Sequence, residues 1–154
     1  MQLKYRNREW SRARCAGMTL IEVLIALVVF SIGLLGLAGL QTLSLRFNTS
    51  AYYRTQATAL AYGLADRMRA NREGALNGSY TADFDDPPPD CDPAADDGGT
   101  PADDLAAWRN ALACQLPLGT GAVASNDNVF TITVQWDDSH GELDPMEFEF
   151  STAL

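Results

Sequence analysis

The sequence has few of the residues that most often carry chemistry. Its 154 residues include one histidine and three cysteines, which are too scattered in the sequence to supply comfortably the four ligands of a typical zinc site. It has no phosphate-binding glycine-rich motif and no Cys–His pairing. Asp138, Ser139 and His140 are adjacent, but a catalytic triad must be assembled in space beside an oxyanion hole. We therefore expect that the protein is not an enzyme and that it binds no metal and no cofactor.

Positive charge is also scarce. There are 11 Lys and Arg residues against 20 Asp and Glu residues, which gives a net charge of −9. A chain this acidic is a poor candidate for direct binding of nucleic acid or of an anionic membrane surface. Five of the basic residues lie close to the N-terminus: Lys4, Arg6, Arg8, Arg12 and Arg14.

A long stretch without charge follows these basic residues. Between Met18 and Leu45 the only charged residue is Glu22. Roughly 20 apolar residues, rising about 1.5 Å each in a helix, cross the hydrocarbon of a bilayer. A carboxylate inside such a run costs free energy, so we expect Glu22 to have a partner.

An ordinary secretory signal also has basic residues before an apolar run, but a small-residue cleavage site follows that run. Here no such site follows it, and the basic residues lead directly into Gly17. A cut between Gly17 and Met18 would remove the basic leader, with its net charge of +4, and take the chain from −9 to −13. It would also create an α-amino group four residues, about one helical turn, from Glu22. The amine of a neighbouring subunit would neutralise Glu22 in a helix bundle of low dielectric constant.

Residues 17–22, with the sequence G-M-T-L-I-E, and the apolar run behind them resemble the class III signal of type IV pilins and pseudopilins. The resemblance implies cleavage after Gly17 by prepilin peptidase, N-methylation of Met18 and subunit docking through Glu22. Most members have Phe where this chain has Met18. The basic leader predicts a cytoplasmic N-terminus, so we expect a single-pass inner-membrane protein with a periplasmic head, which later enters the pilus.

Two further stretches, residues 31–38 and 65–72, are similar to the minor pilins called type IV pilus modification proteins (PilV), as is the shorter segment 131–136. This similarity implies a role in initiating pilus assembly and in the pilus tip complex. The implied partners are other minor pilins, the major pilin, the inner-membrane assembly platform and a tip adhesin. The alternatives are a type II secretion minor pseudopilin of the GspI kind and a filament-tip module that binds calcium or a receptor.

The helix is predicted to continue to about Arg72, and we expect three parts: a cleaved leader (1–17), a membrane and filament-core helix (18–45) and a head (46–154). One face of the second half is apolar at helical spacing: Ala57, Leu60, Ala61, Leu64 and Met68. The residues largely opposite are Thr55, Tyr62, Asp66, Arg69 and Glu73.

Residues 74–99 are predicted to form a loop, because the three prolines at 87–89 exclude a helix and a central strand. The acidic stretch 83–99 suggests calcium, but it lacks the EF-hand spacing, and we favour a solvated loop. Loss of Cys15 with the leader leaves Cys91 and Cys114, for which we expect a disulfide in an oxidising compartment. A metal pair and free thiols are the alternatives.

The remaining elements complete an α+β fold. Thr100, Pro101 and Asp103 indicate a helix start, and this helix should run to about Cys114. Residues 129–136 and 146–150 alternate in polarity as strands do, and a weaker third strand is placed at 121–124. The predicted fold is pilin-like: a long N-terminal helix packed on a small antiparallel sheet.

Overall fold

The computed structural model describes residues 17–93, 99–139 and 141–154. Within them, three helices precede three strands along the chain. The helices are α1 (Leu20–Ala70), α2 (Arg72–Leu76) and α3 (Pro101–Gln115), and the strands are β1 (Thr120–Asn126), β2 (Val129–Trp136) and β3 (Met146–Ala153). Residues 44–154 form a compact unit, the head, which contains the second part of α1. The predicted α+β class is confirmed.

Helix α1 is 51 residues long and contains no proline, so nothing in its sequence interrupts the backbone ladder. It ends at Ala70, with Arg67 and Arg69 in the last turn, where cations interact favourably with the helix dipole. Asn71 separates α1 from α2, and its side chain accepts a hydrogen bond from Gly74 N as the N-cap of α2. The predicted end at about Arg72 is therefore confirmed to within two residues.

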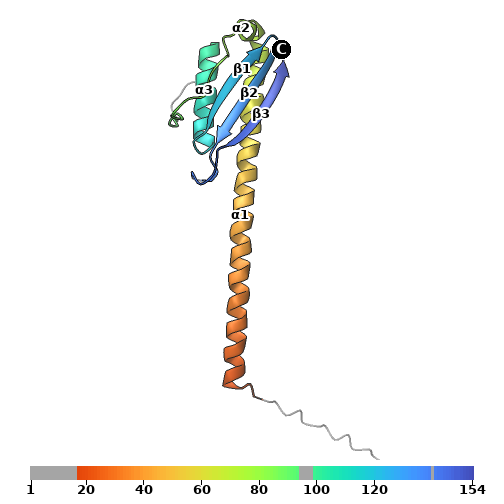
Figure 1. Cartoon of the computed structure of the whole chain (residues 1–154), viewed down its shortest axis with the longest axis vertical. Coiled ribbons are helices and arrows are strands. Elements are labelled where there is room, and N and C mark those ends of the chain that lie inside the picture. Colours follow the sequence, from red (N-terminus) through yellow and green to blue (C-terminus); the bar gives the residue numbers. More distant parts are fainter. Residues whose placement is uncertain (1–16, 94–98, 140) are drawn as a thin grey trace, which may run out of the picture. The chain divides into compact units, whose positions relative to one another are not determined.

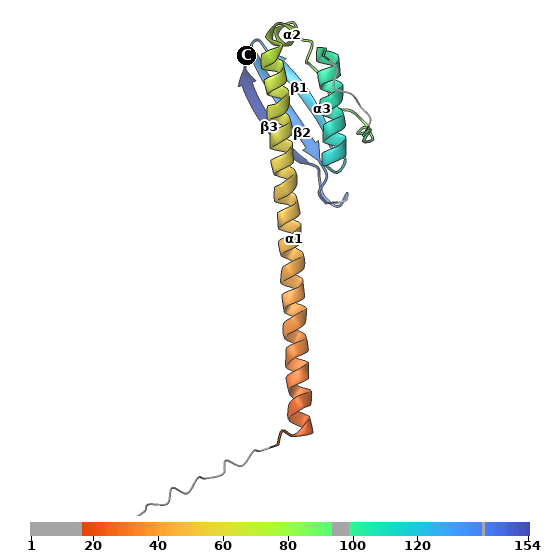
Figure 2. The same cartoon turned by 180° about the vertical axis from the view of Figure 1, so that it is seen from behind.

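The three strands form one antiparallel sheet in the order β1-β2-β3. In its register Ile132 of β2 lies opposite Val123 of β1 and Phe150 of β3. Alternate residues of β2 are buried, as the period of a strand with one core face requires. Helix α3 and the second part of α1 cover this face, as the opposite views in Figures 1 and 2 show.

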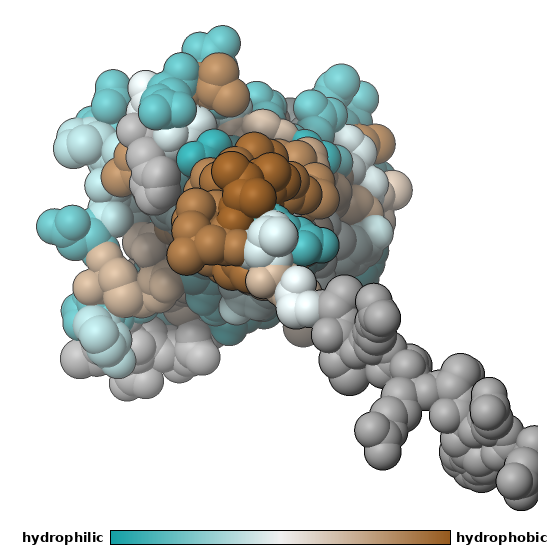
Figure 3. Space-filling view, turned by 90° about the horizontal axis from the view of Figure 1, so that it is seen from below, coloured by the Kyte–Doolittle hydropathy of each residue, from teal (hydrophilic) through white to brown (hydrophobic). Residues whose placement is uncertain are grey.

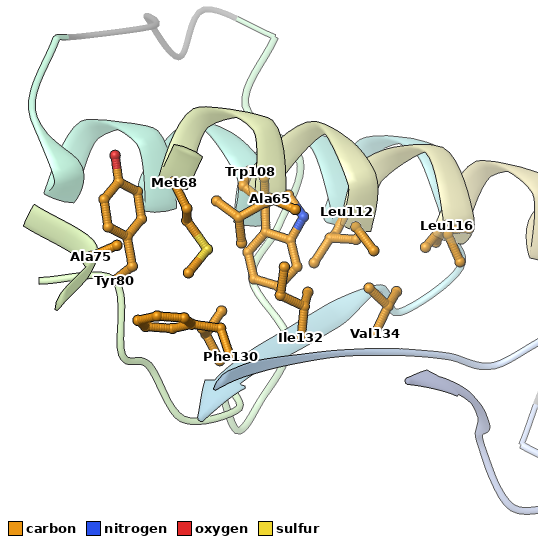
Figure 4. Close-up of a cluster of buried hydrophobic side chains, with 14 of the residues drawn as sticks. Ala65, Met68, Ala75, Tyr80, Trp108, Leu112, Leu116, Phe130, Ile132 and Val134 are labelled. Carbon is orange, nitrogen blue, oxygen red and sulfur yellow. The ribbon is translucent and has the colours of Figure 1, made fainter. Parts of the chain in front are cut away.

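The core of the head lies between this face of the sheet and the two helices (Figure 4). The predicted apolar stripe of α1 is confirmed, with Leu60 at its partly buried margin and Ala65 as an additional member. From α3 come Trp108 and Leu112, and from β2 come the buried residues of the alternating pattern. The side chains with the largest fully buried volume are Trp136, Tyr80, Phe130, Leu64, Met68, Leu112, Ile132 and Val134.

Helix α3 begins as predicted. Thr100 is its N-cap, and it forms a capping box with Asp103, whose backbone N donates to Thr100 Oγ1 at 3.2 Å. The helix approaches β1 closely at Gly121. A Cβ added there would collide with the Trp108 ring and would lie 2.8 Å from Leu112 Cδ1, so only glycine fits without displacement.

The predicted loop over 74–99 needs a correction at its start. Residues 74–76 belong to the short helix α2, because the Asn71 side chain caps its first turn. Farther along, Ala82 pairs with Val123 of β1 through two backbone hydrogen bonds of 3.0 and 2.7 Å. This isolated bridge extends the outer edge of β1 by one residue pair.

Candidate functional site

The segment that precedes α3 is tied to that helix at three places. Arg109 donates from Nη2 to the Asp83 carbonyl oxygen at 2.6 Å, and its Nη1 lies 3.1 Å from Asp85 Oδ1. Asn110 exchanges two hydrogen bonds of 2.7 and 2.8 Å with the backbone of Asp92. A disulfide joins the exposed residues Cys91 and Cys114, which is the pairing that we predicted.

These ties bear on the calcium hypothesis for residues 83–99. The Asp85 carboxylate is already paired with a guanidinium, so it is not simply available to a cation. No group of three or more His, Cys, Asp or Glu residues that could hold a metal is found in the described part of the chain. Asp96 and Asp97, which contributed to the hypothesis, lie outside that part.

A second polar cluster joins three parts of the head: α1, α3 and the segment that follows α2. The Tyr80 hydroxyl donates to Asp104 Oδ2 at 2.5 Å, and Arg67 Nη1 lies 3.3 Å from Asp104 Oδ1. Burial, the hydrogen bond and the negative charge of Asp104 raise the pKa of Tyr80 from 10.0 to about 12. The cluster fixes three segments against one another.

The turn at 137–139 is built around a buried carboxylate. Asp137 Oδ1 accepts from the backbone N and the hydroxyl of Ser139 at 2.8 and 2.7 Å, and Asp137 Oδ2 accepts from Gly141 N at 2.6 Å. The Ser139 hydroxyl also accepts from Leu143 N at 2.9 Å. Ser139 therefore serves to shape the turn, while His140 lies outside the described residues.

At the N-terminal end of α1, Thr19 begins the helix. Its hydroxyl oxygen accepts from Glu22 N at 3.3 Å, and its carbonyl oxygen accepts from the backbone N of Glu22 and of Val23 at 3.1 and 3.3 Å. A Thr side chain in this place satisfies one of the donors that the first helical turn leaves open. The position of Thr19 thus sets where the helix starts.

Glu22 lies in this first turn, where a carboxylate is favoured by the partial positive charge of the helix N-terminus. It is exposed, and no described cation pairs with its carboxylate. The partner that the sequence predicts for it, the α-amino group of a neighbouring subunit at Met18, belongs to another molecule. Subunit docking through Glu22 therefore stays a prediction.

Gly17 lies just before the helix and is exposed. A Cβ added at this position would meet no atom within 4 Å. The fold around it would therefore accept a larger side chain. If glycine is required here, the requirement comes from another molecule that acts on this site. The peptidase that we predict to cleave between Gly17 and Met18 is such a molecule.

The residues that follow Glu22 are apolar and uncovered. Every residue from Gly17 to Thr49 is exposed, and Figure 3 shows apolar side chains gathered over the N-terminal end of α1. By length and composition α1 could cross a membrane. An apolar surface of this extent on a helix needs lipid or other helices around it, because soluble monomers rarely expose one.

Comparison with known protein families yields one match, and it lies in the N-terminal segment. Residues 12–38 match the prokaryotic N-terminal methylation motif. The chain carries a prepilin-type signal. No curated protein and no solved structure matches the chain.

The prepilin-type signal supports a type IV pilin or pseudopilin, and with the apolar helix it fits an inner-membrane-anchored pilin-type protein. The match ends at residue 38 and does not reach the head. Assembly with other components of a pilin-type filament follows from this class. The cleavage after Gly17 and the methylation of Met18 remain predictions.

Sequence reasoning missed the polar contacts that join the segments of the head. The cluster of Arg67, Tyr80 and Asp104 joins residues that are far apart in the sequence. The one local signal was Asp104, an acid in the first turn of a capped helix, which the helix dipole alone explains. Arg109 was likewise indistinguishable from a solvated helix residue.

Proposed function

We propose that this pilin-type chain is a minor pilin of a type IV pilus. It is processed by prepilin peptidase after Gly17, N-methylated at Met18, and contributes to initiation of pilus assembly and to the tip complex. The observation that supports the proposal is the order of the methylation motif, an uncovered apolar helix and an unpaired Glu22 one helical turn from the new N-terminus.

The mechanism is transfer of the helix from lipid into a bundle of like helices. In the membrane, apolar side chains of α1 face hydrocarbon, and Glu22 lies near the cytoplasmic end. In the filament the same side chains pack against other subunits, and the cationic amine at Met18 of one subunit meets the carboxylate of Glu22 in another. Because the dielectric constant there is low, this pair is both strong and costly to leave incomplete.

The proposed role is structural, and we assign no catalysis and no cofactor to the chain. The partners are other minor pilins, the major pilin, prepilin peptidase, the inner-membrane assembly platform and a tip adhesin. The similarity of residues 31–38 and 65–72 to PilV supports the pilus over secretion. The prepilin-type signal itself suits a type II secretion pseudopilin equally well, so this is the second candidate.

A strain that lacks the chain distinguishes the two candidates. We expect loss of sheared surface pili and of twitching, while enzymes secreted through the periplasm still leave the cell. A copy with Glu22→Ala should fail to restore pili although the protein is made and processed. Glu149→Gln, which removes an exposed carboxylate from β3, is the matched control and should restore them.

The opposite result has an equally definite meaning. Secreted enzymes trapped in the periplasm, with pili and twitching intact, would show that the chain is a secretion pseudopilin. Full function of the Glu22→Ala copy would contradict docking through this carboxylate in either system.

A further inference from the structure

Two arginines of α1 stand apart from all other charges of the chain. Between Glu22 and Asp66 there is no acidic residue, and Arg46 and Arg54 are the only charged residues in this interval. From Asp66 onward, 18 acidic residues face four arginines. The membrane-proximal part of α1 is thus cationic, although the head is strongly acidic.

The four arginines from Asp66 onward are engaged within the head. Arg67 and Arg69 pair with Asp104 and Asp66, and Arg109 pairs with Asp85. Arg72 donates to the Leu154 carbonyl oxygen at 3.0 Å. By contrast, Arg46 and Arg54 are exposed, and no described carboxylate pairs with either.

Aromatic side chains accompany these two arginines. Phe47 is 66% exposed and Tyr52 is 56% exposed. We call Arg46, Phe47, Tyr52 and Arg54 the exit belt. Basic and aromatic residues are the side chains that concentrate where a helix passes from hydrocarbon to water, because each has an apolar body and a polar end.

The length of the uncharged run places the exit belt at that boundary. Residues 23–45 carry no charge, and as a helix they span about 35 Å, slightly more than the roughly 30 Å of bilayer hydrocarbon. When Glu22 lies at one interface, Arg46 lies at the other. Side chains of a helix lean toward its N-terminus, so Arg54 also extends toward the lipid.

The exit belt occupies two sides of the helix. At about 100° per residue, Arg54 and Phe47 point in nearly the same direction, and Arg46 lies within about 100° of both. Tyr52 points to the other side of the helix, and all residues from Gln41 to Thr49 are exposed. A single protein partner would contact one side of the helix. A medium that encloses the helix, such as the headgroup layer, contacts every side.

We infer that the exit belt binds phospholipid headgroups in the outer, periplasmic leaflet of the inner membrane, where Arg46 and Arg54 bind the phosphates. This binding fixes the depth of α1 in the membrane. The phosphates then hold the acidic head at a set distance from the bilayer. This inference rests on membrane anchoring by α1 and is independent of whether the filament is a pilus or a secretion pseudopilus.

The test measures the depth of a probe next to the exit belt. The full chain, with Cys15→Ser and Ser44→Cys, is labelled with a fluorophore at residue 44 and reconstituted at about one chain per vesicle in phosphatidylethanolamine and phosphatidylglycerol. Lipids that carry quenchers at known depths report its position. We expect Arg46→Gln with Arg54→Gln to shift the probe by about one helical turn, roughly 5 Å.

Two matched variants complete the design. Arg46→Lys with Arg54→Lys keeps the charge and should keep the depth. Arg69→Gln with Arg72→Gln removes the same charge from the head and should leave the probe in place. An equal depth for the Arg46/Arg54 glutamine variant and the parent would overturn the inference.

Two other outcomes would overturn the inference for different reasons. A shift that occurs only at many chains per vesicle would identify the acidic head of a second copy, and not lipid phosphate, as the partner of the arginines. A parent probe that no lipid quencher reaches would show that α1 is not anchored, which would also contradict the proposed function. The first of these leaves the proposed function intact.

Discussion

No contact in the described part of the chain requires the glycine at position 17. Its Cβ position is open, whereas Gly121 is enclosed by Trp108, Leu112 and the Thr133 carbonyl oxygen. The two glycines therefore belong to different classes. One is required by the packing of the head, and for the other we propose that an enzyme which must approach the backbone requires it.

Gly17→Val tests the processing site directly. We expect the variant chain to keep its leader, because a branched side chain blocks access to the peptide bond, while the head folds as before. Intact-mass measurement of the membrane-extracted protein reports the leader and the methyl group on Met18. A variant that loses its leader at the usual bond would show that the glycine is not what the peptidase reads.

Tyr80 gives the head a defined response to alkali. Because the pKa of Tyr80 is about 12 in the folded chain against the ordinary tyrosine value of 10.0, the neutral hydroxyl is favoured by folding. Its contribution to stability is complete below pH 10 and is lost as the pH rises to about 12. We expect Tyr80→Phe to remove this loss, measured by urea unfolding between pH 9 and pH 12.

The control for this pH effect is Tyr62→Phe. Tyr62 is 46% exposed and contacts the Phe150 ring at a centroid distance of 4.4 Å, away from Asp104. A pH dependence that persists in Tyr80→Phe would assign the effect to other groups.

At the scale of elements, the sequence predicted the helices and strands whose bounds are determined by local patterns of residues. Period and caps placed α1 and α3 to within a few residues, and alternation placed β2 at its observed bounds. Strand β1 proved longer than the predicted 121–124 because its ladder extends to Asn126 opposite Val129. The bridge between Ala82 and Val123 was missed, since nothing local to Ala82 indicates a partner 41 residues away.

The close approach of α3 and β1 predicts a contrast between two glycine substitutions. Gly121→Ala should destabilise the head by about 2 kcal/mol, because the new methyl group overlaps Trp108 and Leu112. Gly63→Ala should stabilise it by about 0.5–1 kcal/mol, since that helical position is open. Urea unfolding of the detergent-solubilised chain, followed by tryptophan fluorescence, measures both. Equal effects would contradict the packing at Gly121.

At the scale of the whole molecule, the disulfide closes a loop of 23 residues in sequence separation. In the chain-entropy description such a closure is worth about 3 kcal/mol. We expect Cys91→Ser with Cys114→Ser to lower the free energy of unfolding by about this amount. Cys15→Ser is the control, because Cys15 lies in the predicted leader and is expected to change nothing.

The candidate assembly site was predictable from the sequence for a simple reason. Gly17, Met18 and Glu22 are close in the chain, and the roles that we predict for them depend on the order of a basic leader, a predicted cut and an apolar run. The polar clusters of the head were not predictable, because Arg67, Tyr80 and Asp104 are brought together only by the packing of α3 against α1.

The residues that form the core of the head are synthesised at different times. The apolar stripe of α1 ends at Met68, and the core residues of the central strand β2 begin at Phe130. At the usual pace of about 5 to 20 residues per second, roughly 60 further residues take about 3 to 12 seconds to synthesise. In every newly made chain, the apolar stripe of α1 is therefore exposed for seconds before the strands of its own sheet have been synthesised. The cell must keep that stripe from neighbouring chains during every round of translation.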